Sequence, residues 1–352
     1  GECSTRWIIG TVFLSCFPQI VLRLVLSPDA PAMAYATPYL RYRSLSMMPA
    51  LYSATGFAAF RGMLDTVTPL KISLASNFLK MVLDPIMICR TSLGFVGATI
   101  ATLLSETAAG FANLRLLLTN KLAKMDLLFR PPSGAALKSL VTLGITMVIR
   151  QIAVNVAMVS TSRYAQGLDL SSGVSAAAFS IVNQIYTVGF VVHVAMQGAA
   201  AALVPSTLAK SGRDAARAMG DRLYRWGIIT GFFLGFVQLV ALPHLIPMFT
   251  NIPDVQEAIK VPAIVASLLH VVNGPRFAGE GVFMGLKSFR ELTAITVVGV
   301  SLLVVALKRT PLGQSLGGIM MANVLFSGYQ AVALFLHYNF VGELASRKGR
   351  CY

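Results

Sequence analysis

The strongest constraint on the fold is a series of long apolar stretches separated by short polar connections. A helix that crosses a bilayer needs about 20 mostly apolar residues, and ten stretches of this chain are compatible with such a span. They cover residues 7–27, 37–60, 70–90, 94–118, 136–161, 173–208, 224–250, 258–285, 291–307 and 312–342. The sequence therefore predicts an all-α integral membrane protein with ten transmembrane helices.

The composition excludes the other broad classes of protein. Only 12% of the 352 residues are charged, 55% are hydrophobic and the mean hydropathy is +0.70, whereas a soluble domain carries about 25% charged residues. The chain has four cysteines and no CxxC, HExxH or Cys/His cluster, so we expect neither a disulfide scaffold nor a metal or other cofactor.

The formal charge of +15 has an explanation that does not involve nucleic acid. Transmembrane proteins concentrate Lys and Arg in their cytoplasmic connections. When the ten stretches are threaded alternately through a bilayer, most of the 29 basic residues fall on the side that holds both chain ends. We therefore expect both ends in the cytosol or its equivalent, and no nucleic-acid partner.

Short similarities at a constant spacing indicate an internal repeat. Arg6-Trp7 opens the first stretch and Arg225-Trp226 opens the seventh, while Phe60-Arg61-Gly62 and Phe283-Met284-Gly285 close the second and eighth. Repeats separated by six helices keep the same orientation in the membrane. The sequence thus predicts a six-plus-six architecture in which the first two helices are missing from the front of this chain.

Several sequence blocks resemble the multidrug and toxic compound extrusion (MATE) family. They lie at residues 39–41 and 60–70, at 83–85 with 94–102, and at 279–281. The last block is similar to the plant branch related to DNA-damage-inducible protein F. The resemblance covers about residues 7–342 and implies a partial N-terminal lobe, an inter-lobe loop, a C-terminal lobe and a C-terminal tail. These would comprise residues 1–120 (family helices 3–6), 121–135, 136–342 (family helices 7–12) and 343–352.

The resemblance also implies a function. MATE proteins are secondary antiporters, so we expect export of a small organic solute, an organic anion or a xenobiotic, in exchange for protons or sodium by alternating access. The alternatives are a flippase of lipid-linked or polysaccharide substrates and an inactive truncated copy. An intramembrane enzyme is disfavoured because no catalytic constellation is visible in the sequence. We expect a monomeric, multi-pass protein in a plasma, vacuolar or plastid envelope membrane.

Ionisable residues within the apolar stretches are the candidate functional groups, because charges at membrane depth are costly and commonly serve transport. The resemblance places Asp84 and Thr102 in an ion-responsive site, and Glu280 at a carboxylate that couples proton binding to substrate release. The ion-coupling candidates are Asp84, Thr102, Glu280, Lys80 and Glu106. The alternative for each acid is a structural ion pair, Lys80 with Asp84 or Arg276 with Glu280.

Further polar residues are candidates for the substrate cleft. They are Asn77, Arg150, Asn155, Gln184, His193, Asn273 and Arg276. A cationic lining formed by Arg23, Lys80, Arg150 and Arg276 suits a substrate that carries a carboxylate, and Arg150 argues against export of a simple organic cation. The alternatives for these residues are salt bridges within the protein and side chains that reach the lipid headgroups. For His193, a packed polar residue is the alternative to a proton relay.

Overall fold

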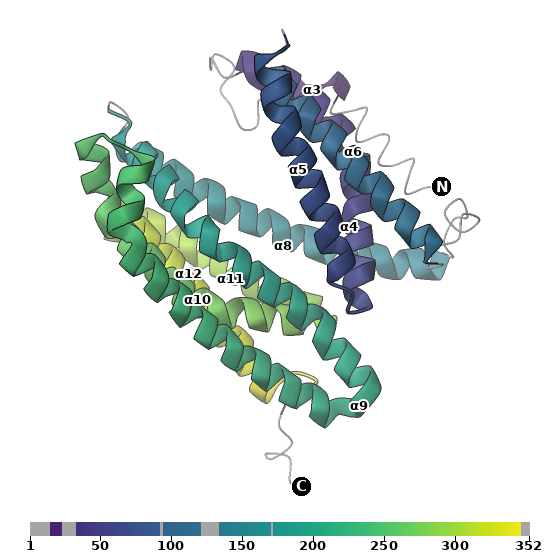
Figure 1. The fold of residues 1–352 in the computed structure, drawn as a ribbon. Coiled ribbons are helices and arrows are strands. Elements are labelled where there is room, and N and C mark those ends of the chain that lie inside the picture. The colour runs from purple at the N-terminus through teal and green to yellow at the C-terminus, as the bar shows by residue number, and fades with distance from the viewer. Residues whose placement is uncertain (1–14, 23–32, 92–93, 121–133, 170–171, 346–352) are drawn as a thin grey trace. The chain divides into compact units, whose positions relative to one another are not determined.

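The computed structural model describes residues 15–22, 33–91, 94–120, 134–169 and 172–345. Arg23 lies outside these residues, as do the inter-lobe loop up to residue 133 and the tail beyond residue 345. The chain divides into two compact units, residues 1–134 and 135–352 (Figure 1). The all-α class is confirmed throughout the described residues.

The first unit contains five described helices. They are α2 (Pro18–Leu22), α3 (Met33–Leu45), α4 (Met47–Gly62), α5 (Val67–Cys89) and α6 (Phe95–Thr119). Helix α6 packs against both α4 and α5. The predicted span 37–60 is thus wrong as a single helix, because α3 and α4 meet at Ser46.

A motif residue accounts for the start of α5. The carboxylate of Asp65 accepts hydrogen bonds from the backbone N–H groups of Val67 and Thr68, each at 3.0 Å. The first N–H groups of a helix have no partner within the helix, and an acidic side chain satisfies them. In the block at residues 60–70, Asp65 therefore caps a helix.

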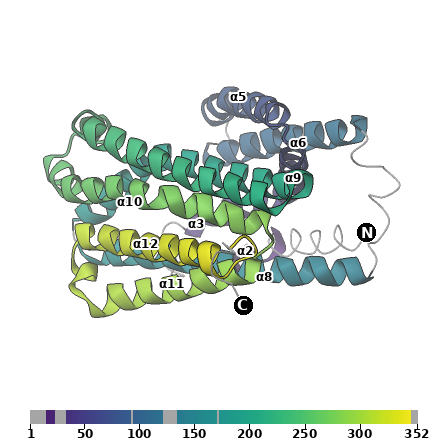
Figure 2. The ribbon, with the colours of Figure 1, turned by 90° about the horizontal axis from the view of Figure 1, so that it is seen from below.

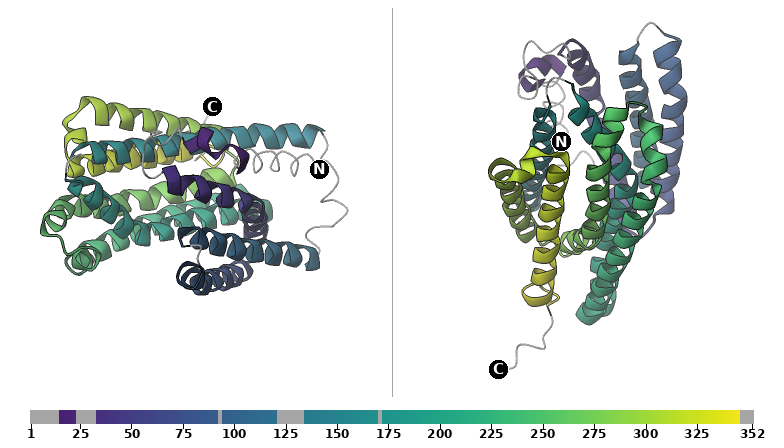
Figure 3. Two further views of the ribbon diagram at one scale, coloured as in Figure 1. Left: turned by 90° about the horizontal axis from the view of Figure 1, so that it is seen from above. Right: turned by 90° about the vertical axis from the view of Figure 1, so that its left-hand side faces the viewer.

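The described part of the second unit forms five α-helices and a short 3-10 turn. They are α8 (Gly134–Gly167), α9 (Val174–Phe249), α10 (Pro253–Gly285), α11 (Phe289–Arg309), the turn η1 (Pro311–Gln314) and α12 (Leu316–Phe340). Figure 2 shows α9, α10, α12 and α11 side by side in that order, and Figure 3 shows the same order from the opposite side. Helix α10 is the central one, since it packs against both α9 and α12.

Helix α9 holds two of the predicted spans. Its backbone is helical on both sides of Gly212, which has φ 80° and ψ −174°, and Figure 1 shows that α9 folds back on itself. A positive φ favours glycine, because a Cβ atom would clash with the backbone. The polar segment between the predicted spans 173–208 and 224–250 is therefore helical on both sides of a break at Gly212.

Six helices among the described residues are long and apolar enough to cross a membrane. They are α5, α8 from Val141 onward, α9, α10, α11 and α12. One of these helices, α9, contains two of the predicted spans. These helices agree with the prediction of an integral membrane protein. The total of ten spans stays a prediction.

Small residues allow α10 to approach the second half of α9. A Cβ atom added to Gly227, Gly231 or Gly235 would lie 2.6 to 2.8 Å from a backbone oxygen of α10. A Cβ atom added to Gly274 of α10 would likewise clash with the backbone oxygen of Gly227. This spacing of glycines every four residues is typical of closely packed helices in membranes.

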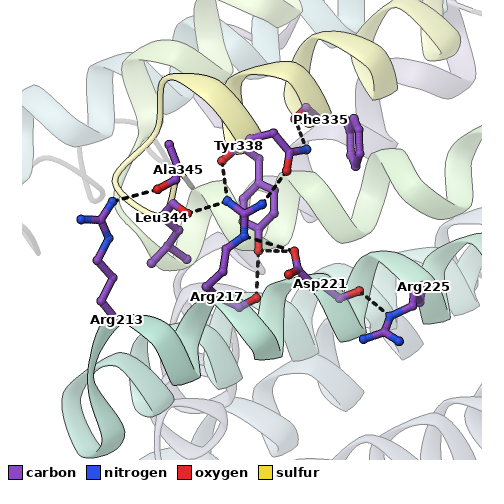
Figure 4. A network of polar contacts seen from close by, with 9 residues as sticks. Arg213, Arg217, Asp221, Arg225, Phe335, Tyr338, Leu344 and Ala345 are labelled. Atoms are coloured by element: carbon purple, nitrogen blue, oxygen red, sulfur yellow. Dashed lines mark hydrogen bonds and ion pairs between the residues drawn. The ribbon is translucent and has the colours of Figure 1, made fainter. Parts of the chain in front are cut away.

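An arginine closes one end of the second unit (Figure 4). Arg217 donates to the backbone oxygens of Tyr338 (3.3 Å) and Leu344 (2.6 Å) and to the side chain of Asn339 (2.5 Å). The carbonyl groups at the end of a helix lack partners within the helix. Arg217 is a hydrogen-bond donor for such a carbonyl group at the end of α12, and it also binds the segment after α12 to the second half of α9.

Candidate functional site

A polar layer crosses the second unit between two apolar clusters. On α10, one cluster includes Val255 to Ala266 and the other begins at Val282. The polar residues of α10 lie between them and are buried. They are Ser267, His270, Asn273, Arg276 and Glu280. Substrate and ion sites of transporters commonly lie at such a level, near the middle of the membrane.

Glu280 is the centre of an ion cluster in this layer. Its Oε2 accepts hydrogen bonds from Arg150 of α8 and from the side-chain amide of Gln197 in α9, the latter at 2.7 Å. Its Oε1 accepts from Nε of Arg276 at 3.1 Å. Only 1% of Glu280 is exposed. All of these partners are donors, so the arrangement is that of a carboxylate held by two guanidinium groups.

Arg276 is held by three polar side chains. Besides Glu280, its guanidinium donates to the side-chain oxygens of Asn273 (3.2 Å) and Ser327 of α12 (3.0 Å). Asn273 in turn donates to the hydroxyl of Tyr186 in α9. The ion cluster thus joins α8, α9, α10 and α12.

A chain of neutral groups continues the layer. Nε2 of His193 lies 3.1 Å from Nδ1 of His270, and Nε2 of His270 lies 2.9 Å from Oε1 of Gln238. The amide nitrogen of Gln238 donates to Ser267 at 3.2 Å. Because the amide oxygen of Gln238 can only accept, His270 donates to it through Nε2. Tyr186 stacks on His270 with ring centres 4.5 Å apart, which links this chain to the ion cluster.

A family model identifies the architecture that contains this layer. The model described as MatE matches residues 7–86 and 145–309, which together make up more than half of the chain.

The chain belongs to the MatE family.

Members of this family are transporters rather than enzymes.

Plant proteins are among the relatives. Protein DETOXIFICATION 43 of Arabidopsis thaliana is 27% identical over 308 residues, which are 85% of this chain and 56% of that protein. Protein DETOXIFICATION 44, chloroplastic, of the same plant is 28% identical over 330 residues, 93% of this chain and 61% of that protein. The chain thus spans somewhat more than half of the length of the curated relatives it matches.

Solved structures share the fold. The crystal structure of MATE in complex with MaL6 matches with a TM-score of 0.81 and 18% identity, over 93% of this chain and 74% of that chain. A MOP superfamily transporter from Pyrococcus furiosus matches with the same TM-score and identity, over 94% and 75%. At this identity the likeness shows the MATE fold and nothing about ligands.

The structure brings together part of the site predicted for this MATE chain. Arg150, Asn273, Arg276 and Glu280 are in one cluster, and His193 lies in the adjoining hydrogen-bond chain. Asn155 and Gln184 are exposed and outside both. The proposed alternative for Glu280, a pair with Arg276, is formed, but Arg150 and Gln197 share the same carboxylate.

The candidates of the first unit are not joined to one another by hydrogen bonds or ion pairs. Glu106 pairs with Arg43 of α3 at 2.7 Å, and the hydroxyl of Thr102 donates to its own helix at Ala98. Among the described residues, no ion pair joins Lys80 to Asp84, and Oδ1 of Asp84 is buried without a hydrogen-bond partner. Asn77 is exposed.

Six residues of the layer were not predicted from the sequence. They are Tyr186, Gln197, Gln238, Ser267, His270 and Ser327. Gln197 follows His193 by four residues and His270 precedes Asn273 by three, so each shares a helix face with a residue that was predicted. This helical spacing is the sequence signal that could have identified Gln197 and His270.

Proposed function

We propose that this chain moves an organic solute across a membrane as a secondary active transporter, by alternating access and in exchange for protons or sodium. The observation that carries the proposal is the buried cluster of Arg150, Arg276 and Glu280 inside an apolar helical unit of the MatE family. Intramembrane charges of this kind are costly and are typical of transport pathways.

The proposed architecture is the six-plus-six arrangement, of which this chain supplies ten spans. The lobes would comprise residues 1–120 and 136–342, with a loop at 121–135 and a tail at 343–352. The support is the internal repeat and the matching of both segments by one family model. We propose a monomer, because alternating access within one such chain needs no second copy.

The proposed substrate is an organic anion or a xenobiotic. The cluster contains two guanidinium groups and one carboxylate, so its charge suits a solute with a negatively charged group. No enzymatic cofactor is proposed.

The proposed ion-responsive groups are the carboxylates Glu280, Asp84 and Glu106. Neutralising Glu280 would remove the charge that holds Arg150, so the position of α8 would depend on ion binding. Asp84 offers a buried oxygen without a partner among the described residues of the first unit.

The proposed location is an integral membrane. Two relatives are described as chloroplastic, which supports the plastid envelope beside the plasma and vacuolar membranes.

Reconstituted vesicles test the proposal. An imposed proton or sodium gradient should drive movement of benzoate, as an organic anion, or of ethidium, as a xenobiotic. Glu280→Gln should reduce the rate to that of empty vesicles. Glu257→Gln is the matched control, because Glu257 lies on the same helix with 74% of its side chain exposed. Transport by Glu280→Gln at the rate of the unaltered chain would refute the assigned role of Glu280.

Neutralising Glu280 also removes the counter-ion of two buried arginines, so misfolding must be separated from loss of transport. The double variant Arg150→Gln/Glu280→Gln restores the charge of the original cluster. It should fold as the unaltered chain does and still fail to transport.

A further inference from the structure

The ion cluster has an excess of one positive charge. Among the described residues of the second unit, Glu280 is the only buried acid, and Arg150 and Arg276 are the buried arginines. The neighbouring titratable groups are Tyr186, His193 and His270. Counted with these three groups in their uncharged forms, the cluster carries a net charge of +1. Burying a charge without a counter-ion is costly, so the cluster is matched to one further anion.

The two arginines are not equivalent. Arg276 donates to Glu280, Asn273 and Ser327, and its guanidinium lies 5.1 Å from the centres of two phenylalanine rings. Its Nε and Nη1 are therefore engaged by side chains of the protein itself. Arg276 is a positioning residue that fixes Glu280.

Arg150 is engaged at one end only. Its Nη2 donates to Glu280, while its Nε is buried and has no hydrogen-bond partner among the described residues. The residue as a whole is 9% exposed. A buried donor without a partner is costly, and a planar guanidinium binds a carboxylate through two parallel N–H groups. The unused donor of Arg150 is suited to such a ligand.

The surface of α8 beside Arg150 is polar. Gln151 and Asn155 are exposed and make a 3.4 Å hydrogen bond to each other. Polar side chains on a membrane helix commonly face a water-filled space rather than lipid. This surface therefore offers a hydrated approach to Arg150.

We propose that Arg150 binds the carboxylate of the transported solute, one anion per chain, through the part of its guanidinium that Glu280 leaves free. The inference rests on the proposed function and narrows the substrate to an anion recognised by α8. Binding one carboxylate makes the charge of the cluster zero while Arg276 and Glu280 stay paired.

Three probes of nearly the same shape test the charge requirement. Benzoate, benzamide and benzamidine differ chiefly in carrying a negative, zero and positive charge. Titration calorimetry of the purified chain should show binding of benzoate and no binding of the other two. Equal binding of benzoate and benzamide would overturn the proposal, as would an absence of benzoate binding.

Substitutions at Arg150 test the residue itself. Arg150→Gln should weaken benzoate binding by about ten- to a hundredfold, the range for a hydrogen bond to a charged group. The benzoate affinity of Arg150→Lys should lie between that of the unaltered chain and that of Arg150→Gln, since an ammonium keeps the charge without the planar pair of donors. Arg163→Gln removes an exposed arginine from the same helix and should leave the affinity unchanged.

Folding does not confound this test. Arg150→Gln leaves Glu280 with Arg276 and Gln197, so thermal unfolding should confirm a folded chain. Benzoate affinity equal in Arg150→Gln and the unaltered chain overturns the role of Arg150. If benzoate fails to bind but a gradient still drives ethidium, this inference fails and the transporter proposal stands. If no gradient drives any probe while benzoate binds through Arg150, the transporter proposal fails and the inference about Arg150 stands.

Discussion

Arg217 and Tyr338 hold each other by both their side chains and their backbone. The guanidinium of Arg217 lies 4.4 Å from the centre of the Tyr338 ring, and the Tyr338 hydroxyl donates to the backbone oxygen of Arg217 at 3.0 Å. The same hydroxyl lies 2.9 Å from Oδ1 of Asp221, which also pairs with Arg217 at 3.3 Å. The contact joins the second half of α9 to the end of α12 (Figure 4).

Tyr338→Phe removes the hydroxyl and keeps the ring. Because the single hydroxyl proton is shared between a carboxylate and a backbone oxygen, we expect a loss of about 1 to 3 kcal/mol in the free energy of unfolding. Denaturant titration in detergent measures it. Tyr329→Phe, on the same helix, is the control, since that hydroxyl has no hydrogen bond to the described residues. Equal effects of the two substitutions would contradict the prediction.

Gly274→Ala tests the close approach of α10 and α9. The added methyl group would overlap the backbone of Gly227, and backbone cannot rotate away as a side chain does. We expect a loss of about 2 kcal/mol or more in the free energy of unfolding. Gly144→Ala, with no atom within 4 Å of the added Cβ, should be neutral or stabilising by up to about 1 kcal/mol. Thermal unfolding of both variants compares them, and a stable Gly274→Ala protein would refute the packing argument.

Gln238→Leu tests the neutral chain next to the ion cluster. The substitution removes the oxygen that accepts from His270 and the nitrogen that donates to Ser267. A buried donor left without an acceptor costs about 1 to 3 kcal/mol, which denaturant titration detects. Gln184→Leu, at an exposed position of α9, should leave stability nearly unchanged. If the two variants have the same free energy of unfolding, the hydrogen bonds of Gln238 do not stabilise the fold.

Asp65 gives a dependence on pH outside the membrane-spanning segments. Hydrogen bonds from the side chain and backbone of Thr68 hold the pKa of Asp65 below its ordinary value. A lowered pKa means that the unfolded state binds the proton more readily. Its stabilising contribution is therefore present at neutral pH and is lost as the pH falls through the folded-state value.

The measurement for Asp65 is the unfolding temperature from pH 7 down to pH 3, compared with Asp65→Asn. The asparagine keeps an oxygen that can accept the same backbone hydrogen bonds but does not titrate. The advantage of the unaltered chain should shrink toward the acidic end. A difference that stays constant with pH would exclude a role for the charge.

Spacing along one helix predicted some of the site and misled elsewhere. Arg276 and Glu280 are four residues apart and form the expected pair. Lys80 and Asp84 have the same spacing and form none, because a helix brings such side chains within reach without requiring contact. Arg150 and Glu280 are 130 residues apart, and only the tertiary fold of the second unit brings them together. No local pattern in the sequence contains that information.

The predicted helices show the same division between local and long-range information. Hydropathy locates α5, α6, α10 and α11 closely, because their apolar lengths match a bilayer. The break between α3 and α4 at Ser46 was missed, although Pro49, in the first turn of α4, is a signal for a helix start. Glycines at 227, 231 and 235 were a readable signal for close packing, and the structure gives them that role.

The break at Gly212 lies between two apolar stretches, 173–208 and 224–250, which are separated by 15 residues rich in charged side chains. Because these residues are helical on both sides of the break, the connection between the two spans is a polar helix with one bend and not an irregular loop. A tag inserted at this bend would lengthen a polar connection and leave the two apolar stretches intact.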